Sequence, residues 1–284
     1  MMKQRNPGDR GGGGIGDPME VSQGGIIGKH WRNQESAFKI ITSIGMEALA
    51  KEAVNLDKAF VLGDRGMRCI DEGTEGGIHG AGSLILLKRD EAVKIIQAAK
   101  IDVIYSHEGC GAAALAYQEL GAEERDRLKL QYQVTTADEY GIIWAKTIAN
   151  QAGKKYGGHI KADEMTRPKE GHIARIAYFD GTGQFDNSKR PEGFPPGFVV
   201  SRRILPPDYA AQEADISVSI ATGNHGFGKL ITPEAPRQFL IVPIGDPRNP
   251  EFSLKKLTAE LGSSGIIEKF GGRVRIDGFT APLK

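Results

Sequence analysis

The sequence predicts an α/β fold with a mainly parallel central sheet flanked by helices. Short apolar runs typical of buried strands alternate along the chain with longer segments whose apolar residues recur at helical spacing. Several strand candidates are followed by turn signals rich in glycine and aspartate. This alternation is typical of sheets whose helical crossovers pack on the faces, and functional groups in such sheets gather at the carboxyl ends of strands.

Five segments in the first part of the chain carry a clear pattern. An apolar stripe predicts a helix over residues 36–56, and the run AFVLG at 59–63 is a strand candidate. The continuously apolar run SLILL at 83–87 predicts a buried strand. Residues 90–100 predict a helix, because the acidic first turn and the basic last residue suit the helix dipole. The run IDVIYS at 101–106 predicts the next strand.

The strand and helix pattern continues through the rest of the chain. We expect a helix from Gly111, a helix over 137–152 and a strand over 173–179. Five prolines between Arg190 and Pro207 indicate a long loop or a linker. Four further elements are expected after this loop, namely strands at 216–221, 239–244 and 274–276 and a helix at 253–261.

These segments suggest three regions. Residues 1–35 are rich in glycine and polar groups and are predicted to form a flexible arm. Residues 36–189 would form the α/β core that carries both cysteines. Residues 190–284 would form a C-terminal extension, which either extends the same sheet or folds as a small subdomain. No internal repeat is evident in the sequence.

The composition is that of an ordinary globular protein. The 284-residue chain is 39% hydrophobic and 26% charged, and its formal net charge of +1 gives no strong attraction to nucleic acid or anionic membranes. No apolar run reaches the roughly 18 residues that a membrane-spanning helix needs. The first residues lack the apolar core of a signal peptide, so we expect a reducing cytoplasmic location, where thiolate metal sites persist.

Both cysteines lie in short motifs that together predict a zinc site. Cys69 and Asp71 are two residues apart, so on a strand their side chains share a face. His107 and Cys110 are three residues apart, and a strand that leads into a helical turn can aim both at one point. Two thiolates and one imidazole are a common zinc ligand set. The fourth position is then either open to water or filled by Asp71.

These motifs resemble those of the β-class carbonic anhydrases. That family carries Cys-x-Asp-x-Arg at one strand end, an Ala-Gly motif, and His-x-x-Cys-Gly at a later strand end. The matching segments here are Cys69–Gly73, His79–Leu84 and His107–Gly111, and Tyr178–Gly183 is similar to the family's strand that ends in a Thr-Gly turn. The resemblance covers about residues 36–185 and implies the fold of that family.

The resemblance implies reversible hydration of CO2 to bicarbonate by a zinc-bound hydroxide, with Cys69, His107 and Cys110 as ligands. Asp71 would accept a hydrogen bond from that hydroxide and orient it. In the family an arginine pairs with this aspartate and keeps it off the metal, but Gly73 stands at the arginine position here, and the segment between the metal motifs is shortened. Three residues are candidates to replace that arginine, namely Arg65, Arg68 and His79.

Two site residues and the oligomeric state leave alternatives open. His79 lies in a glycine-rich segment and is either a substrate-pocket or proton-shuttle residue or a turn residue, and Asp71 is otherwise a strand-end cap. The resemblance implies a homodimer or a higher even oligomer, with the helix at 36–56 clasping the neighbour. The alternative functions are hydrolysis of CS2 or COS at the same site, and a closed structural zinc site of two Cys, one His and one Asp.

Overall fold

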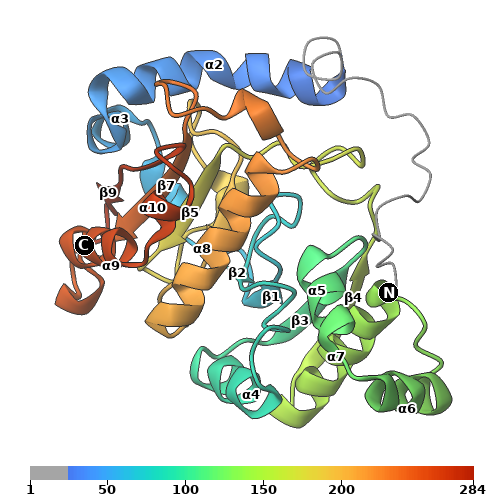
Figure 1. The fold of residues 1–284 in the computed structure, drawn as a ribbon. Coiled ribbons are helices and arrows are strands. Elements are labelled where there is room, and N and C mark those ends of the chain that lie inside the picture. The colour runs from blue at the N-terminus through green and yellow to red at the C-terminus, as the bar shows by residue number, and fades with distance from the viewer. Residues whose placement is uncertain (1–24) are drawn as a thin grey trace, which may run out of the picture.

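The computed structural model describes residues 25–284 and confirms the α/β class, with parallel sheets flanked by helices. The arm predicted over residues 1–35 lies mostly outside the described residues, and helix α2 (Ile26–Ile44) begins within its last part. Figure 1 shows two sheets side by side, with α2 and α3 (Met46–Glu52) along one side of the molecule. Among the described residues, no helix is long and apolar enough to cross a membrane.

The first sheet has the strand order β2-β1-β3-β4, and all its pairs are parallel. Its strands are β1 (Gly66–Arg68), β2 (Ile78–His79), β3 (Val103–His107) and β4 (Lys155–Ile160). Four helices surround it, namely α4 (Arg89–Ala98), α5 (Gly111–Glu119), α6 (Ala122–Tyr132) and α7 (Ala137–Ala152). Helix α7 begins with a capping box between Thr136 and Glu139, and its buried face includes Trp144 and Ile148.

The second sheet has the order β6-β5-β7-β8, with β9 also on β7, and it too is wholly parallel. Its strands are β5 (Ile176–Asp180), β6 (Phe198–Val200), β7 (Phe239–Gly245), β8 (Val274–Ile276) and β9 (Phe279–Thr280). The accompanying helices are α8 (Pro207–Thr222), α9 (Leu254–Ser263) and α10 (Ile266–Lys269). Short 3-10 turns complete the chain at Leu56–Phe60, Asn187–Lys189, Gly228–Leu230 and Pro250–Phe252.

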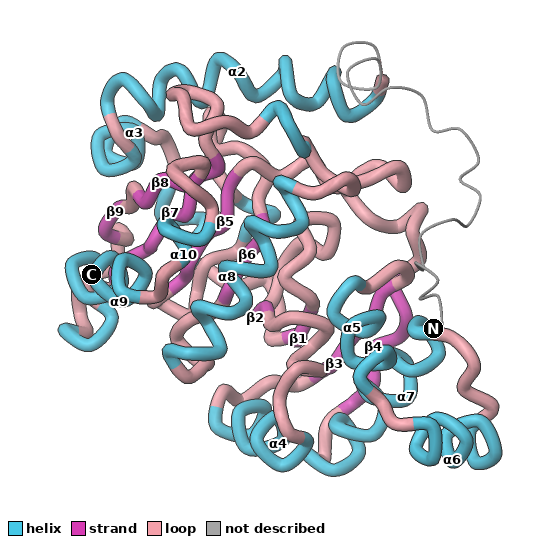
Figure 2. Tube along the Cα trace, in the orientation of Figure 1, coloured by secondary structure: helices cyan, strands magenta, loops and turns pink. Residues whose placement is uncertain are grey.

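The two sheets meet at their edge strands β2 and β6 (Figure 2). The backbone N–H of Val199 donates to the carbonyl of Ile70 at 3.1 Å, and that of Ser201 donates to the carbonyl of His79 at 3.3 Å. The hydroxyl oxygen of Ser201 in turn accepts a hydrogen bond from the backbone N–H of His79 at 2.9 Å. These contacts join the predicted core to the C-terminal region along β2, which pairs with β1, the strand that Cys69 follows.

Most of the predicted elements are confirmed with shifts of a few residues, but the helix predicted over 36–56 is divided into α2 and α3 at Gly45, which has a φ of +81°. The predicted proline-rich loop contains strand β6, and three strand predictions are wrong. Residues 59–63 begin as the end of a 3-10 turn, and β1 starts only at Gly66. Residues 83–87 form consecutive turns, and residues 216–221 belong to α8. A short apolar run reports burial, and both helices and loops can bury one. Ser83 and Leu84 adopt positive φ angles of 56° and 70°, which excludes a regular strand there.

Helix α2 packs its inner face on the second sheet around a buried cation. Arg175 is 1% exposed and its guanidinium lies between two rings of α2, 3.6 Å from the centroid of Trp31 and 3.8 Å from that of Phe38. Burial lowers the pKa of Arg175 to about 9. Its Nη2 donates to the carbonyl of Pro236 at 2.6 Å, so stacking on aromatic faces supplements a single hydrogen bond.

Candidate metal centre

Three potential ligands converge where the first sheet ends. Cys69 directly follows β1, His107 is the last residue of β3, and Cys110 is the N-cap of α5. Their ligand atoms all lie within 4.8 Å of one another, and the three residues are 6%, 3% and 5% exposed. Since β1 and β3 are parallel neighbours, their carboxyl ends bring the two motifs together.

The arrangement fits a tetrahedral metal ion. The two sulfur atoms are free thiols 3.9 Å apart, close to the roughly 3.8 Å expected for two sulfurs that each lie about 2.3 Å from one zinc ion. His107 Nε2 is buried and has no hydrogen-bond partner. Its Nδ1 lies 3.0 Å from the carbonyl of Glu108, so an Nδ1–H tautomer leaves Nε2 free as a ligand. The Cys69, His107 and Cys110 cluster can therefore hold a metal ion.

The protonation states of Cys69, His107 and Cys110 depend on one another. The hydrogen bond between the two thiols raises the pKa of Cys69 and lowers that of Cys110. Burial would lower the pKa of His107, but the charges of Cys69 and Asp71 raise it to about 9. Without a metal the cluster therefore favours one thiolate beside a protonated imidazole, and a metal cation would replace that proton.

Helix α7 holds the loops around the three ligands. The backbone N–H of Gly109, which has a φ of +69°, donates to Asp138 in the first turn of α7 at 2.9 Å. Trp144 Nε1 donates to the carbonyl of Ser83 at 3.2 Å and so supports the loop after β2. From that loop, the N–H of Gly82 donates to the sulfur of Cys69 at 3.2 Å. The ligands are thus oriented by surrounding hydrogen bonds, as metal sites require.

Asp71 is paired with Arg167, a residue that the sequence analysis does not single out. Arg167 donates from Nε to Asp71 Oδ1 at 2.8 Å and from Nη2 to Oδ2 at 2.9 Å. Burial would raise the pKa of Asp71, but the hydrogen bonds from Arg167 hold it at about 2. Arg167 lies on the long loop between β4 and β5, and no spacing in the sequence connects it with Asp71.

Gly73 makes room for this ion pair. A Cβ atom at Gly73 would stand 2.8 Å from Cγ of Arg167 and 3.1 Å from Cβ of Met165. The Gly73 N–H also donates to Oδ1 of Asp71 at 2.8 Å. Asp71 thus receives its arginine from the loop between β4 and β5, and the glycine at position 73 allows that loop to approach.

The other candidates for the partner of Asp71 lie elsewhere. Arg68 forms two hydrogen bonds to Asp64, at 2.9 and 3.1 Å, and stacks over the ring of Tyr105. Arg65 donates to the backbone carbonyls of Ala99 and Lys100 at the end of α4.

His79 is fully buried behind Cys69. Its Nδ1 lies 2.6 Å from the Cys69 carbonyl, its Nε2 has no hydrogen-bond partner, and burial lowers its pKa to about 4. A neutral His79 thus hydrogen-bonds to the backbone of the metal-ligand candidate Cys69. The segment 78–80 is buried and not exposed to solvent.

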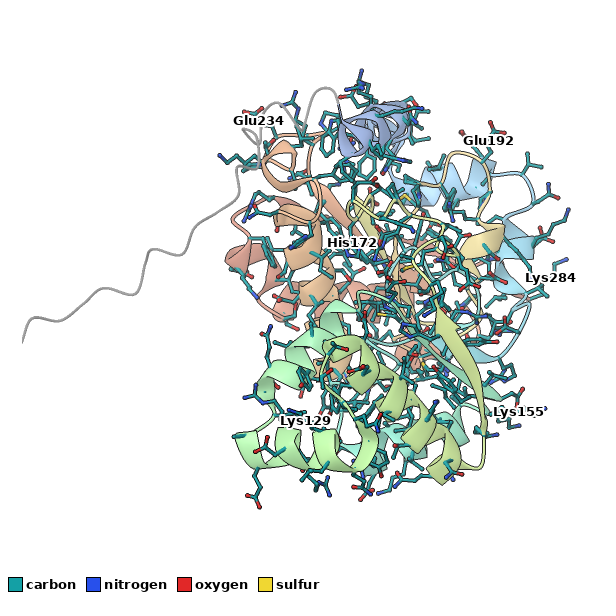
Figure 3. The ribbon with its side chains drawn as sticks, turned by 90° about the vertical axis from the view of Figure 1, so that its right-hand side faces the viewer. Lys129, Lys155, His172, Glu192, Glu234 and Lys284 are labelled. Carbon is teal, nitrogen blue, oxygen red and sulfur yellow. The ribbon has the colours of Figure 1, made fainter. Side chains whose placement is uncertain are left out.

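A second ionisable pair lies directly beside Asp71. Glu72 accepts from the N–H of Ile173 at 2.7 Å, and its other oxygen lies 2.8 Å from Nδ1 of His172. Burial would lower the pKa of His172, but the charge of Glu72 raises it. Figure 3 places His172 near the centre of the molecule. The segment that leads into β5 is thereby tied to the motif that carries Cys69 and Asp71.

A buried carboxyl group supports the loop after β2 from the opposite side. Glu213 of α8 is 5% exposed, its Oε1 accepts from the N–H of Ala81 at 2.8 Å, and its Oε2 has no partner. Burial raises the pKa of Glu213 from 4.5 to about 8. The unfolded chain therefore releases this proton near pH 4.5, whereas the folded protein keeps it until about pH 8. The free energy of unfolding consequently falls as the pH rises from 4.5 to 8.

We expect Glu213→Gln to remove this pH dependence. The neutral amide keeps an acceptor for the Ala81 N–H, so the variant should match the wild type below pH 4.5 and exceed its stability at pH 8. The expected gain at pH 8 is on the order of 3 kcal/mol. Urea unfolding at several pH values measures it, with the exposed Glu268→Gln as the control. A variant less stable than the wild type at pH 8 would show that Glu213 is ionised in the folded state.

Comparisons with known proteins found no relative of this chain. A scan against protein-family models and searches of curated proteins and of solved structures each returned no match. Two features of this chain bear on its function, namely the geometry of the Cys69, His107 and Cys110 cluster and the Asp71–Arg167 pair.

Proposed function

We propose that Cys69, His107 and Cys110 bind Zn²⁺ and that the protein catalyses the reversible hydration of CO2 to bicarbonate. The donor set of two thiolates and one imidazole suits zinc, and the sulfur separation of 3.9 Å supports a tetrahedral ion. A bound zinc ion would supply a Lewis acid that acidifies a water molecule. Three protein ligands leave a fourth position for that water.

The observation that carries this proposal is the two-pronged pairing of Asp71 with Arg167. Both carboxylate oxygens of Asp71 accept hydrogen bonds from Arg167, so the side chain is held in one orientation and its charge is compensated. An aspartate held in this way is not free to complete a closed site as a fourth ligand. The pair therefore argues against the alternative of a structural zinc site of two Cys, one His and one Asp.

Asp71 also supplies what the reaction needs beyond the metal. With a pKa of about 2 it stays ionised, so it acts as a hydrogen-bond acceptor at neutral pH. Zinc bound by two thiolates has little net charge and acidifies water less than a site of three histidines, so an acceptor that orients the nucleophile has more to contribute. Arg167 keeps that acceptor in place, and we assign it as a positioning residue.

The strong burial of the ligands limits the substrate. None of the three ligands is more than 6% exposed, and a Cβ atom at Gly82 would lie only 3.1 Å from Cβ of Ala112 and 3.4 Å from the sulfur of Cys110. Small linear molecules such as CO2 suit this enclosure better than a peptide or a nucleotide. The proposal also retains a homodimer or higher even oligomer as its expected assembly.

Stopped-flow measurement of CO2 hydration by the zinc-loaded protein from about pH 6.5 to 9 tests the proposal. We expect activity that rises with pH and that disappears in Cys110→Ala. A protein that holds one zinc per chain but shows no activity above background at any pH would contradict it. The same samples assayed with CS2 and COS then show whether the site hydrolyses these substrates instead.

A further inference from the structure

The two sheets repeat one topology, which identifies a counterpart of the metal centre in the second sheet. The order β2-β1-β3-β4 corresponds strand for strand to β6-β5-β7-β8, and every pair in both is parallel. A similar aspartate turn lies near the carboxyl end of both β1 and β5, with Asp71 three residues beyond β1 and Asp180 as the last residue of β5. Asp71 Oδ1 accepts from the N–H two residues later, at 2.8 Å, and Asp180 Oδ1 accepts from the N–H of Thr182, also at 2.8 Å.

This counterpart has no thiol or imidazole in place of the metal ligands. Asp180 at the end of β5, Thr182 just after it and Asp246 just after β7 stand there instead. Asp180 is buried and satisfied by hydrogen bonds from Thr182 and Phe185. Within residues 25–284 these residues belong to no cluster able to hold a metal ion. The second site is therefore not a second metal centre.

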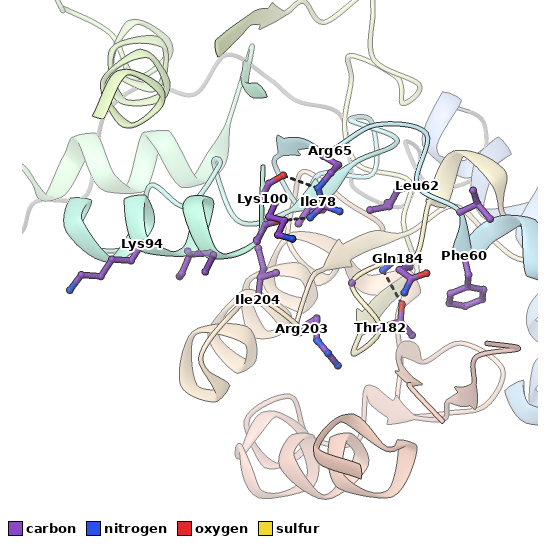
Figure 4. Close-up of a pocket in the computed structure, with 15 residues that line it drawn as sticks. Phe60, Leu62, Arg65, Ile78, Lys94, Lys100, Thr182, Gln184, Arg203 and Ile204 are labelled. Atoms are coloured by element: carbon purple, nitrogen blue, oxygen red, sulfur yellow. Dashed lines mark hydrogen bonds between the residues drawn. The ribbon is translucent and has the colours of Figure 1, made fainter. Parts of the chain in front are cut away.

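A cleft of about 800 Å³ opens at this position (Figure 4). One wall consists of the loops after β5 and β6, with Thr182, Gln184 and Arg203. The other wall comes from the first half of the chain, with Arg65 and the segment 94–100 at the end of α4. The cleft thus lies between the two sheets, and both halves of the repeat contribute to it.

The charged residues that line this cleft are all cationic, namely Arg65, Lys94, Lys100 and Arg203. Among the described residues, neither lysine forms an ion pair, and Arg65 donates only to backbone carbonyls. Arg203 Nη1 lies 3.7 Å from Asp246, which Arg248 also holds at 3.1 Å, and the Arg203 guanidinium lies 4.4 Å from the ring centroid of Phe252.

Arg203 also carries an unsatisfied donor. Its Nη1 is buried and finds no hydrogen-bond partner within residues 25–284, although the side chain as a whole is 35% exposed. A buried guanidinium nitrogen without an acceptor is costly, and a ligand oxygen would remove that cost. Together with Lys94 and Lys100, the Arg203 donor indicates that the cleft would take an anionic ligand.

We propose that this cleft binds a small organic anion with more than one phosphate or carboxylate group. Arg203 and Lys100, on opposite walls, would hold separate anionic groups, while Arg65 adds charge and Thr182 adds a polar edge. A volume of about 800 Å³ falls in the range of small-molecule sites and exceeds what a single inorganic anion fills. This site is independent of the proposed CO2 hydration, because it shares no residue with the metal cluster.

Isothermal titration calorimetry of the full zinc-loaded chain tests this proposal, in about 50 mM salt so that charge screening is moderate. The probes are fructose 1,6-bisphosphate and tricarballylate, which represent phosphate and carboxylate chemistry and do not chelate zinc strongly. Binding of either probe supports the site, and a preference between them identifies the anionic group. No binding of either probe at millimolar concentration would overturn it.

Substitutions in the cleft test whether the anionic probes bind there. Arg203→Gln and Lys100→Gln should each weaken it by about tenfold or more, because each removes one charge-assisted contact. Lys129→Gln, an exposed lysine on α6, should leave the affinity unchanged. If both cleft variants bind the probe as tightly as the wild type, the anion binds elsewhere and the proposal fails. Lys100 is exposed and its side chain forms no ion pair within residues 25–284, so this variant reports on binding rather than on folding.

Discussion

Replacing Arg167 by methionine is expected to lower CO2 hydration by about 100-fold while one zinc ion per chain remains bound. The substitution removes two charge-assisted hydrogen bonds from Asp71, which is 4% exposed. Such bonds contribute about 1.5–3 kcal/mol each, and a loss of about 3 kcal/mol in transition-state stabilisation corresponds to roughly 100-fold in rate. Stopped-flow kinetics and atomic absorption measure the two quantities on the same sample.

In Arg167→Met the carboxylate of Asp71 is expected to bind the metal. Without Arg167, Asp71 can turn to the metal, so X-ray absorption of the variant should gain an oxygen ligand in place of water. Arg167→Lys should recover only part of the activity, because an ammonium group cannot donate two parallel hydrogen bonds to a carboxylate. Arg190→Met, which breaks a single-bonded and more exposed arginine–carboxylate pair with Glu75 at 2.7 Å, is the control and should stay active. Full activity in Arg167→Met would remove the pair from the mechanism.

Removal of a metal ligand is expected to have the second large effect, on both zinc content and stability. His107→Ala should reduce bound zinc from one ion per chain to almost none and should lower the melting temperature of the zinc-loaded protein markedly. The reason is that metal bound only by the folded state adds its binding free energy to stability. The apo cluster also leaves two thiols and one imidazole, all nearly buried, without a cation to satisfy them.

Differential scanning calorimetry with and without a chelator checks this expectation. Chelator treatment should lower the melting temperature of the wild type to near that of His107→Ala and should leave His107→Ala itself unchanged. His225→Ala is the control, because His225 is exposed and the substitution keeps its backbone carbonyl, which accepts from the N–H of His172 at 2.7 Å. Equal zinc content in wild type and His107→Ala would show that the metal, if any, binds elsewhere.

Local patterns predicted the elements whose side-chain periodicity is long enough to be unambiguous. Helix α7 has the predicted bounds, and its capping box between Thr136 and Glu139 is a signal within four residues. The failures at 83–87 and 216–221 concern short apolar runs. Such a run indicates burial in the core, but the choice between strand, helix and turn depends on the neighbours against which it packs.

The metal cluster could be predicted because each motif is local and the sheet completes the rest. Cys69 and His107 follow or end adjacent parallel strands, whose carboxyl ends necessarily lie together. The absence of an arginine at position 73 likewise indicated that Asp71 needs another partner. That partner, Arg167, lies 96 residues away in sequence on a loop without periodicity, so no pattern could have indicated it.

By itself the sequence determined the α/β class and the identity of the three metal-binding candidates, because both depend on residue types at short spacing. The tertiary structure alone decided which arginine reaches Asp71, that His79 is buried behind Cys69, and that the two sheets share one topology. These features arise from packing between segments distant in sequence. Contacts of that kind depend on the complete fold, because no short-range interaction encodes where a loop or an edge strand will meet another.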